Sequence, residues 1–93
     1  MSPALLPPAP HFHQESGALR FWVAVDDGRF IGASISAQTL HYRFKGDLSG
    51  ADAVPTYEAH RAAIDAAVQR RVAGGSIEPV MLREYDVGAA PRL

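Results

Sequence analysis

The stretch ALRFWVAVDDGRFIGASIS, residues 18–36, constrains the fold more than any other part of the chain. It is rich in β-branched and aromatic residues and is interrupted once, by Asp26-Asp27-Gly28, a pattern typical of two strands joined by a tight turn. Because successive side chains of a strand point to opposite faces, the length of this turn decides which residues share a face.

Two turn lengths predict different sheets. A two-residue turn, Asp27-Gly28, would place Val23 opposite Gly32 and give the two strands different apolar faces. A three-residue turn that begins at Asp26, with Gly28 in a left-handed bulge, pairs Val23 with Ile31 instead. One face is then apolar: Phe21, Val23, Val25, Ile31, Ala33 and Ile35. The other carries Arg20, Trp22, Ala24, Phe30 and Ser34. We therefore predict the longer turn, with both aspartates as solvated turn residues.

Two helices are expected after the hairpin. The first spans about 37–44, capped by Ser36 or Ser34 and ended by Gly46, with Leu40 and Phe44 on one face. The second spans about 55–73, where alanine is abundant, Pro55 suits a first helical position and Gly74-Gly75 stops the helix. The alternating segment IEPVMLREYDV predicts a final strand over about 79–86.

This order, β-β-α-α-β, predicts an α+β two-layer sandwich. An antiparallel hairpin and a C-terminal strand would form the sheet, with the helices on one face. We expect residues 1–11 to be a flexible proline-rich arm, residues 12–87 a single α+β domain and residues 88–93 a tail. The pattern leaves open which side of the hairpin the final strand joins.

Composition narrows the function classes. The net charge is −1 and Lys45 is the only lysine, which argues against a nucleic-acid partner. The chain has no cysteine, which removes thiol catalysis and disulfides and suits the cytoplasm. No apolar stretch has the length of a membrane span, so we expect no membrane partner. No motif points to a cofactor, and no catalytic residue is assigned, so the prediction leans against an enzyme.

Two long stretches resemble a known family. LRFWVAVDDGRFIGASISAQTL and YEAHRAAIDAAVQRRVAGGSIEPVMLREYDV resemble the small bacterial proteins of domain of unknown function family 1488. The resemblance covers about residues 12–87 and is most specific at ISAQTL, at RAAIDAAVQRRVAGG and at EPVML. The chain departs from the family pattern at HFHQESG and in the arm before it. The resemblance implies a small cytoplasmic α+β protein and supplies no activity.

Three groups of residues are candidate sites. Trp22, Phe30 and Tyr85 would form an aromatic interface patch if all three lie on the outer sheet face, unless the arm residues Leu5, Leu6 and Phe12 cover them. The second candidate is a cationic face, which would form if five arginines lie on one surface: Arg20, Arg43, Arg61, Arg70 and Arg71. The alternative is a solvated helix face.

His11 and His13 are the weak metal candidates, because both imidazoles would point the same way in a strand. Two ligands make a weak site, and the alternative is two histidines on a mobile arm.

The favoured function is a non-enzymatic protein-interaction or self-associating module, with a homodimer or another protein as partner. The alternatives are a nucleic-acid-associated regulator that uses the arginine face and a metal- or small-molecule-binding protein that uses His11 and His13.

Overall fold

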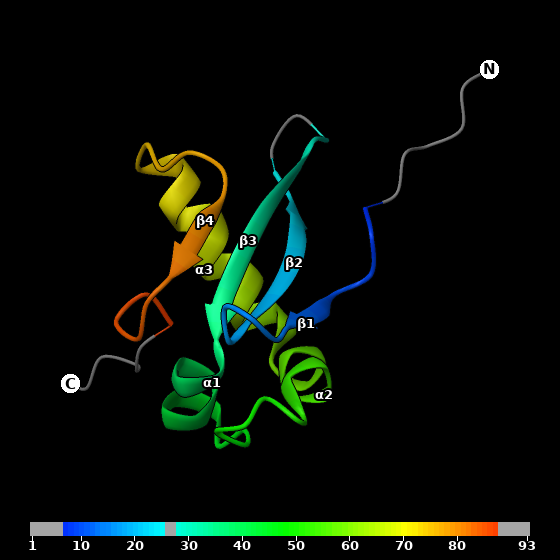
Figure 1. The fold of residues 1–93 in the computed structure, drawn as a ribbon. Helices are drawn as coiled ribbons and strands as arrows, with labels where there is room; N and C mark the ends of the chain where they lie inside the picture. The colour runs from blue at the N-terminus through cyan, green and yellow to red at the C-terminus, as the bar shows by residue number, and fades with distance from the viewer. Residues whose placement is uncertain (1–6, 26–27, 88–93) are drawn as a thin grey trace.

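A four-stranded sheet with the order β1-β2-β3-β4 organises the chain (Figure 1). The computed structural model describes residues 7–25 and 28–87. The elements in chain order are β1 (His11–His13), β2 (Ala18–Ala24), β3 (Phe30–Ser36), α1 (Ala37–Phe44), α2 (Ala53–Ala59), α3 (Arg61–Ala73) and β4 (Val80–Leu82). The α+β class is confirmed, although the order is β-β-β-α-α-α-β instead of the predicted β-β-α-α-β.

The β2–β3 hairpin has the predicted register. Val23 pairs with Ile31 and Phe21 with Ala33 in antiparallel orientation. The Val25 N–H donates to the Arg29 carbonyl at 2.9 Å, and Gly28 adopts a φ of 83°, which an L side chain rarely takes. The three-residue turn is therefore confirmed, while its two aspartates lie outside the described residues.

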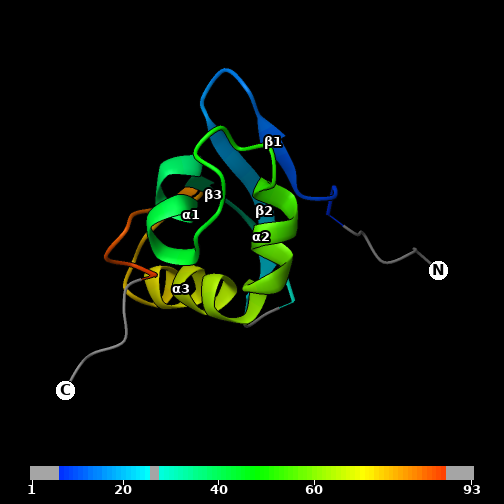
Figure 2. The ribbon, with the colours of Figure 1, turned by 90° about the horizontal axis from the view of Figure 1, so that it is seen from below.

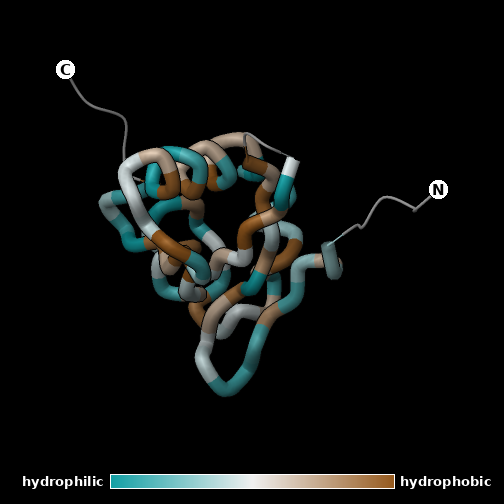
Figure 3. The backbone as a smooth tube through the Cα atoms, turned by 90° about the horizontal axis from the view of Figure 1, so that it is seen from above, coloured by the Kyte–Doolittle hydropathy of each residue, from teal (hydrophilic) through white to brown (hydrophobic). Residues whose placement is uncertain are grey.

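The core lies between one face of the sheet and the helices. α3 lies behind the sheet in Figure 1, and α1 and α2 lie at its lower end; Figure 2 shows the three helices together from below. Along the tube in Figure 3, apolar positions alternate with more polar ones. The largest fully buried side chains are Tyr57, Phe21, Leu19, Ile35, Leu40, Ile64, Val23, Val68 and Val80.

Helix α1 has the predicted bounds, but a different residue ends it. The Ser36 hydroxyl caps the helix by accepting from the Thr39 N–H at 3.0 Å. Gly46 was predicted to end the helix, yet Lys45 takes the left-handed position with a φ of 63°. The Gly46 N–H then donates to the Leu40 carbonyl, so both residues complete the C-terminal cap.

The single helix predicted over 55–73 is wrong, because the chain forms two helices that meet at His60. Helix α2 starts earlier, at Ala53, which puts Pro55 in the third helical position, where its missing N–H is still not needed. The two helices pack against different partners, α2 against α1 and β1 and α3 against β2 and β4. A straight helix cannot face both sets of neighbours.

The strand boundaries at both ends differ from the predictions. His11–His13 form the edge strand β1, which starts at the last residue of the predicted arm. Three residues are too few for sequence periodicity to reveal a strand. The strand predicted over 79–86 is only Val80–Leu82, because residues 84–87 form a turn. This strand, β4, pairs in parallel with β3, which places it at the other edge of the sheet.

Candidate functional site

The outer face of the sheet, opposite the helices, carries the candidate site. Trp22 pairs with Gly32 and Phe30 with Ala24, so both aromatic side chains lie on this face as predicted from the pleat. Tyr85 lies in the turn after β4 and does not line this site. Phe12 packs with the core on the opposite side, so it does not cover Trp22. The other two residues of that predicted cover, Leu5 and Leu6, lie outside the described residues.

A groove runs along β3 on this outer face. Its floor consists of the small outward residues of β3, namely Gly32, Ser34 and Ser36. Larger side chains of the neighbouring strands flank them, Arg20 and Trp22 from β2 and Met81 from β4, with Pro79 just before β4. We call this hollow the β3 groove; its volume is about 680 Å³, within the range of ligand pockets.

One end of the β3 groove is closed over Gly32. The Glu78 carboxylate accepts the Gly32 N–H at 2.7 Å, and a Cβ placed on Gly32 would lie 2.9 Å from Glu78 Oε2 and 3.3 Å from Trp22 Nε1. The indole edge and the carboxylate therefore approach the same point, which is possible only because position 32 has no side chain. On its other side Trp22 contacts the His11 ring, with centroids 5.9 Å apart.

Several polar groups of the β3 groove have no partner in the described part of the chain. The Arg20 guanidinium, the Trp22 indole N–H and the Ser34 hydroxyl make no side-chain hydrogen bond with residues 7–25 or 28–87. Within those ranges no buried side-chain nitrogen or oxygen lacks a partner, so these groups reach solvent. The groove thus presents hydrogen-bond donors beside the apolar side chains of Trp22, Pro79 and Met81.

The five arginines of the predicted cationic face do not gather on one surface. Arg20 lies on the outer sheet face, whereas Arg61 pairs with Glu58 at 3.7 Å beside Tyr57 on the helical side. The other three, Arg43, Arg70 and Arg71, all contact the segment that includes and follows β4.

These last three arginines hold the segment after β4 in place. Arg43 Nε donates to the Glu84 carbonyl and Arg70 donates to the Asp86 carbonyl. Arg71 forms a 2.7 Å ion pair with Asp86, whose side chain is 8% exposed, and also donates to the Met81 carbonyl. Because Met81 is in an edge strand, this last bond occupies a carbonyl that another chain would need for pairing.

The two histidines both point to the outer face but are not part of a larger ligand set. His13 Nδ1 lies 2.8 Å from the Ser16 hydroxyl, and His11 contacts Trp22. Across the described ranges 7–25 and 28–87, no group of three or more His, Asp or Glu side chains is placed to hold a metal ion.

A partly buried polar pair joins α2 to α3. The Tyr57 hydroxyl donates to Asp65 Oδ1 at 2.7 Å, and the Arg61 guanidinium lies 5.1 Å from the Tyr57 ring centroid. Burial, with the Asp65 hydrogen bond, raises the pKa of the Tyr57 phenol above its ordinary value. Burial also raises the pKa of Asp65, against the opposing effects of Tyr57 and Arg61. Because Tyr57 is fully buried and its hydroxyl donates to Asp65, we assign this pair to stabilising the helix junction.

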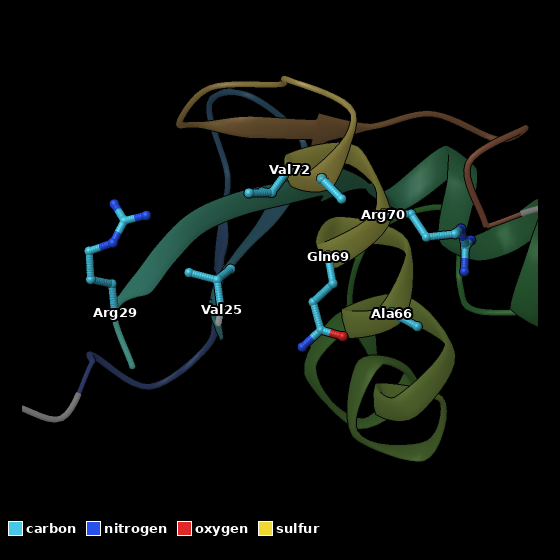
Figure 4. A pocket seen from close by; sticks show the side chains of 7 residues that line it. Val25, Arg29, Ala66, Gln69, Arg70 and Val72 are labelled. Atoms are coloured by element: carbon cyan, nitrogen blue, oxygen red, sulfur yellow. The ribbon is translucent and has the colours of Figure 1, made fainter. Parts of the chain in front are cut away.

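A second hollow of about 610 Å³ lies between the hairpin end and α3 (Figure 4). Figure 4 shows Val25 and Val72 between Arg29 and Arg70, whose side chains extend away from each other. Gln69 donates to the Ala24 carbonyl at 3.0 Å, so its amide already has a structural role. With its two cations apart, this hollow is not built for an anion.

The pleat of the hairpin correctly predicted that Trp22 and Phe30 lie on the outer face, but of the three predicted aromatic residues only Trp22 lines the β3 groove, and the groove itself was not predicted. A signal was present, because Gly32, Ser34 and Ser36 are small residues at alternate positions of a strand whose neighbours carry large ones. The groove also needs β4 beside β3, and the order of the strands was not fixed by the sequence pattern.

Comparison with known proteins identifies one family. The family model described as "Protein of unknown function (DUF1488)" matches residues 6–82, from before β1 to the end of β4. No curated protein and no solved structure matches the chain. Within the described ranges, none of the helices has the length and apolar character needed to cross a membrane. Since the match covers most of the sequence, the chain belongs to the DUF1488 family.

Proposed function

We propose that this protein is a non-enzymatic interaction module of the cytoplasm that binds an extended, proline-rich protein segment in the β3 groove. The observation that carries the proposal is an open groove on the outer sheet face, which no segment within residues 7–25 and 28–87 covers and whose Trp22 and Arg20 donors have no partner in those ranges.

The dimensions of the groove fit an extended chain. From Gly32 to Ser36 the floor covers four residue steps of a strand, roughly 13 Å at about 3.3 Å per residue. The flanking strands β2 and β4 are two strand spacings apart, roughly 10 Å. A polyproline II segment rises about 3.1 Å per residue, so about four of its residues span the floor.

The chemistry of the groove fits the same ligand. A proline-rich segment offers backbone carbonyl acceptors and few N–H donors, because proline has no N–H. Trp22, Arg20 and Ser34 supply the complementary donors, while Met81 and Pro79 supply apolar contact for the proline rings. Such a segment is already extended in solution, so binding it costs less conformational entropy than ordering a flexible chain.

Pairing of a partner strand with the sheet edges is less favoured. At β4 the Arg71 side chain occupies the Met81 carbonyl, and at β1 the edge strand is only three residues long. Short edges and occupied edge groups both reduce strand addition. The outer sheet face, free of covering segments in the described part of the chain, therefore remains as the surface for a partner.

Decaproline is a direct probe, because Trp22 is the only tryptophan and its fluorescence reports the groove. Titration should give a saturable change in Trp22 emission. Met81→Ala and Arg20→Ala should each weaken binding about tenfold, since each removes a groove contact. Tyr42→Ala removes an exposed aromatic side chain on α1, away from this groove, and should leave binding unchanged.

Two results would overturn the proposal. One is an emission that stays constant up to millimolar decaproline. The other is a change that Met81→Ala and Arg20→Ala leave unaltered, which would assign the signal to nonspecific contact. Saturable binding of a small metabolite in the groove, with decaproline excluded, would favour a small-molecule function instead.

A further inference from the structure

We infer that the segment that occupies the β3 groove is Pro7–Pro10 of a second copy of this chain, so that exchanged N-terminal arms hold a homodimer together. This inference rests on the function proposed above, because it names the partner of the same groove. It concerns the part of the arm that the structure describes, residues 7–10.

The arm has the composition that the groove requires. Pro7-Pro8-Ala9-Pro10 carries a single backbone N–H, on Ala9, and no charged side chain. Four residues in the polyproline II form are about 12 Å long, close to the length of the groove floor. Pro8 and Ala9 are exposed, so their surfaces are open to a partner.

The arm does not reach the groove of its own copy along its described path. It leaves from β1, which lies on the far side of β2 from the groove. Figures 1 and 2 both show residues 7–10 running outward from that edge, away from β3 and β4. A segment directed away from its own groove is suited to the groove of another molecule.

The base of the arm is anchored, which favours exchange. His11, the residue after Pro10, is in β1 and contacts the Trp22 ring, while Phe12 packs with the core beside Gly50. The arm therefore starts from a fixed point, and its prolines limit the conformations that it loses on binding. A net charge of −1 per chain adds little repulsion between two copies.

Sedimentation velocity of the full chain tests the inference. We expect a species of twice the chain mass at tens of micromolar. The triple variant Pro7→Ser, Pro8→Ser, Pro10→Ser should raise the dissociation constant of the dimer at least tenfold. The matched control Pro91→Ser changes a proline outside the arm and should leave the mass unchanged.

Mixing two variants identifies the contact. The double variant Arg20→Ala, Met81→Ala keeps the arm and the contact of His11 with Trp22 but loses two groove contacts, and the triple proline variant keeps the groove but loses the arm. Each should be monomeric alone, and the mixture should form a heterodimer, because one arm and one groove remain compatible. Circular dichroism of each variant checks that both are folded.

The decaproline titration separates this inference from the proposed function. If the triple variant binds decaproline while the wild type is monomeric, the groove function stands and the exchange of arms is refuted. A triple variant that stays dimeric, or a mixture that stays monomeric, refutes the exchange as well. A monomeric wild type whose Trp22 emission changes in the triple variant also refutes the exchange, since the arm would then lie in the groove of its own copy. Failure of decaproline to bind any variant removes both proposals.

Discussion

The hydrogen bond between Tyr57 and Asp65 should make a measurable contribution to stability. Tyr57→Phe removes the hydroxyl that donates to Asp65 Oδ1 at 2.7 Å, while the ring keeps its contact with Phe21, whose centroid lies 4.6 Å away. A hydrogen bond to a charged group contributes about 1.5–3 kcal/mol to the free energy of unfolding. Asp65 is only half-buried, so solvent screening favours the lower end, about 1.5 kcal/mol. For a chain of this size that loss lowers Tm by roughly 6–12 °C.

The free-energy cost of Tyr57→Phe should depend on pH, because the Asp65 carboxyl titrates. Burial raises the pKa of Asp65 above the ordinary 3.8, so the folded state binds this proton more tightly than the unfolded chain. The resulting stability is fully present below pH 3.8 and is lost as the pH rises through the folded-state value. The Tyr57 hydroxyl limits this loss by stabilising the carboxylate. Tyr57→Phe should therefore cost more free energy at pH 7 than at pH 4.

Urea denaturation followed by circular dichroism at both pH values measures the effect. Asp65→Asn is the matched control, because its amide oxygen can still accept from Tyr57 and its stability should lose the dependence on the Asp65 proton. If Tyr57→Phe unfolds at the wild-type urea concentration at pH 7, or loses the same free energy at pH 4 and pH 7, this reasoning is refuted.

Three further substitutions test other parts of the structure. Arg71→Ala removes the cation from the mostly buried Asp86 carboxylate, which keeps the Arg83 N–H, and should cost about 2 kcal/mol; amide hydrogen exchange over residues 81–87 should become faster, and unchanged exchange would contradict the prediction. Lys45→Gly relieves a left-handed backbone and should raise the free energy of unfolding in urea by about 1 kcal/mol, whereas a loss would show that the lysine side chain matters more. Gly50→Ala places a Cβ against the Phe12 ring at a φ of 84° and should lower Tm by at least about 8 °C; an unaltered Tm would mean that β1 moves freely.

Parts of the fold that depend on local pattern were predictable. The pleat forces every side chain to change face when the register slips by one residue, so the hairpin turn followed from the apolar pattern of β2 and β3. Helix α1 followed from the Ser36 cap and from Leu40 and Phe44 on one face. Its end at Lys45 did not, because a left-handed lysine is stable only when the surrounding structure holds it.

Parts that depend on distant contacts were not predictable. The break at His60 arises because α2 and α3 pack against different strands, although the alanine-rich sequence favours one helix. The sequence predicted either a cationic face or a solvated face for the arginines of α3, and only the folded chain brings Arg71 to Asp86. The groove likewise requires β4 to lie beside β3, which no local pattern determines.

The nuclear magnetic resonance signal of the Trp22 indole N–H tests the central claim most directly, because the chain has one tryptophan and therefore one such signal. On addition of decaproline to the triple arm variant, this proton should shift downfield and become protected from exchange with water, since it would donate to a backbone carbonyl of the bound segment. An indole signal that keeps its shift and its exchange rate, while signals elsewhere in the protein respond, would show that the ligand binds outside the β3 groove and would contradict the account.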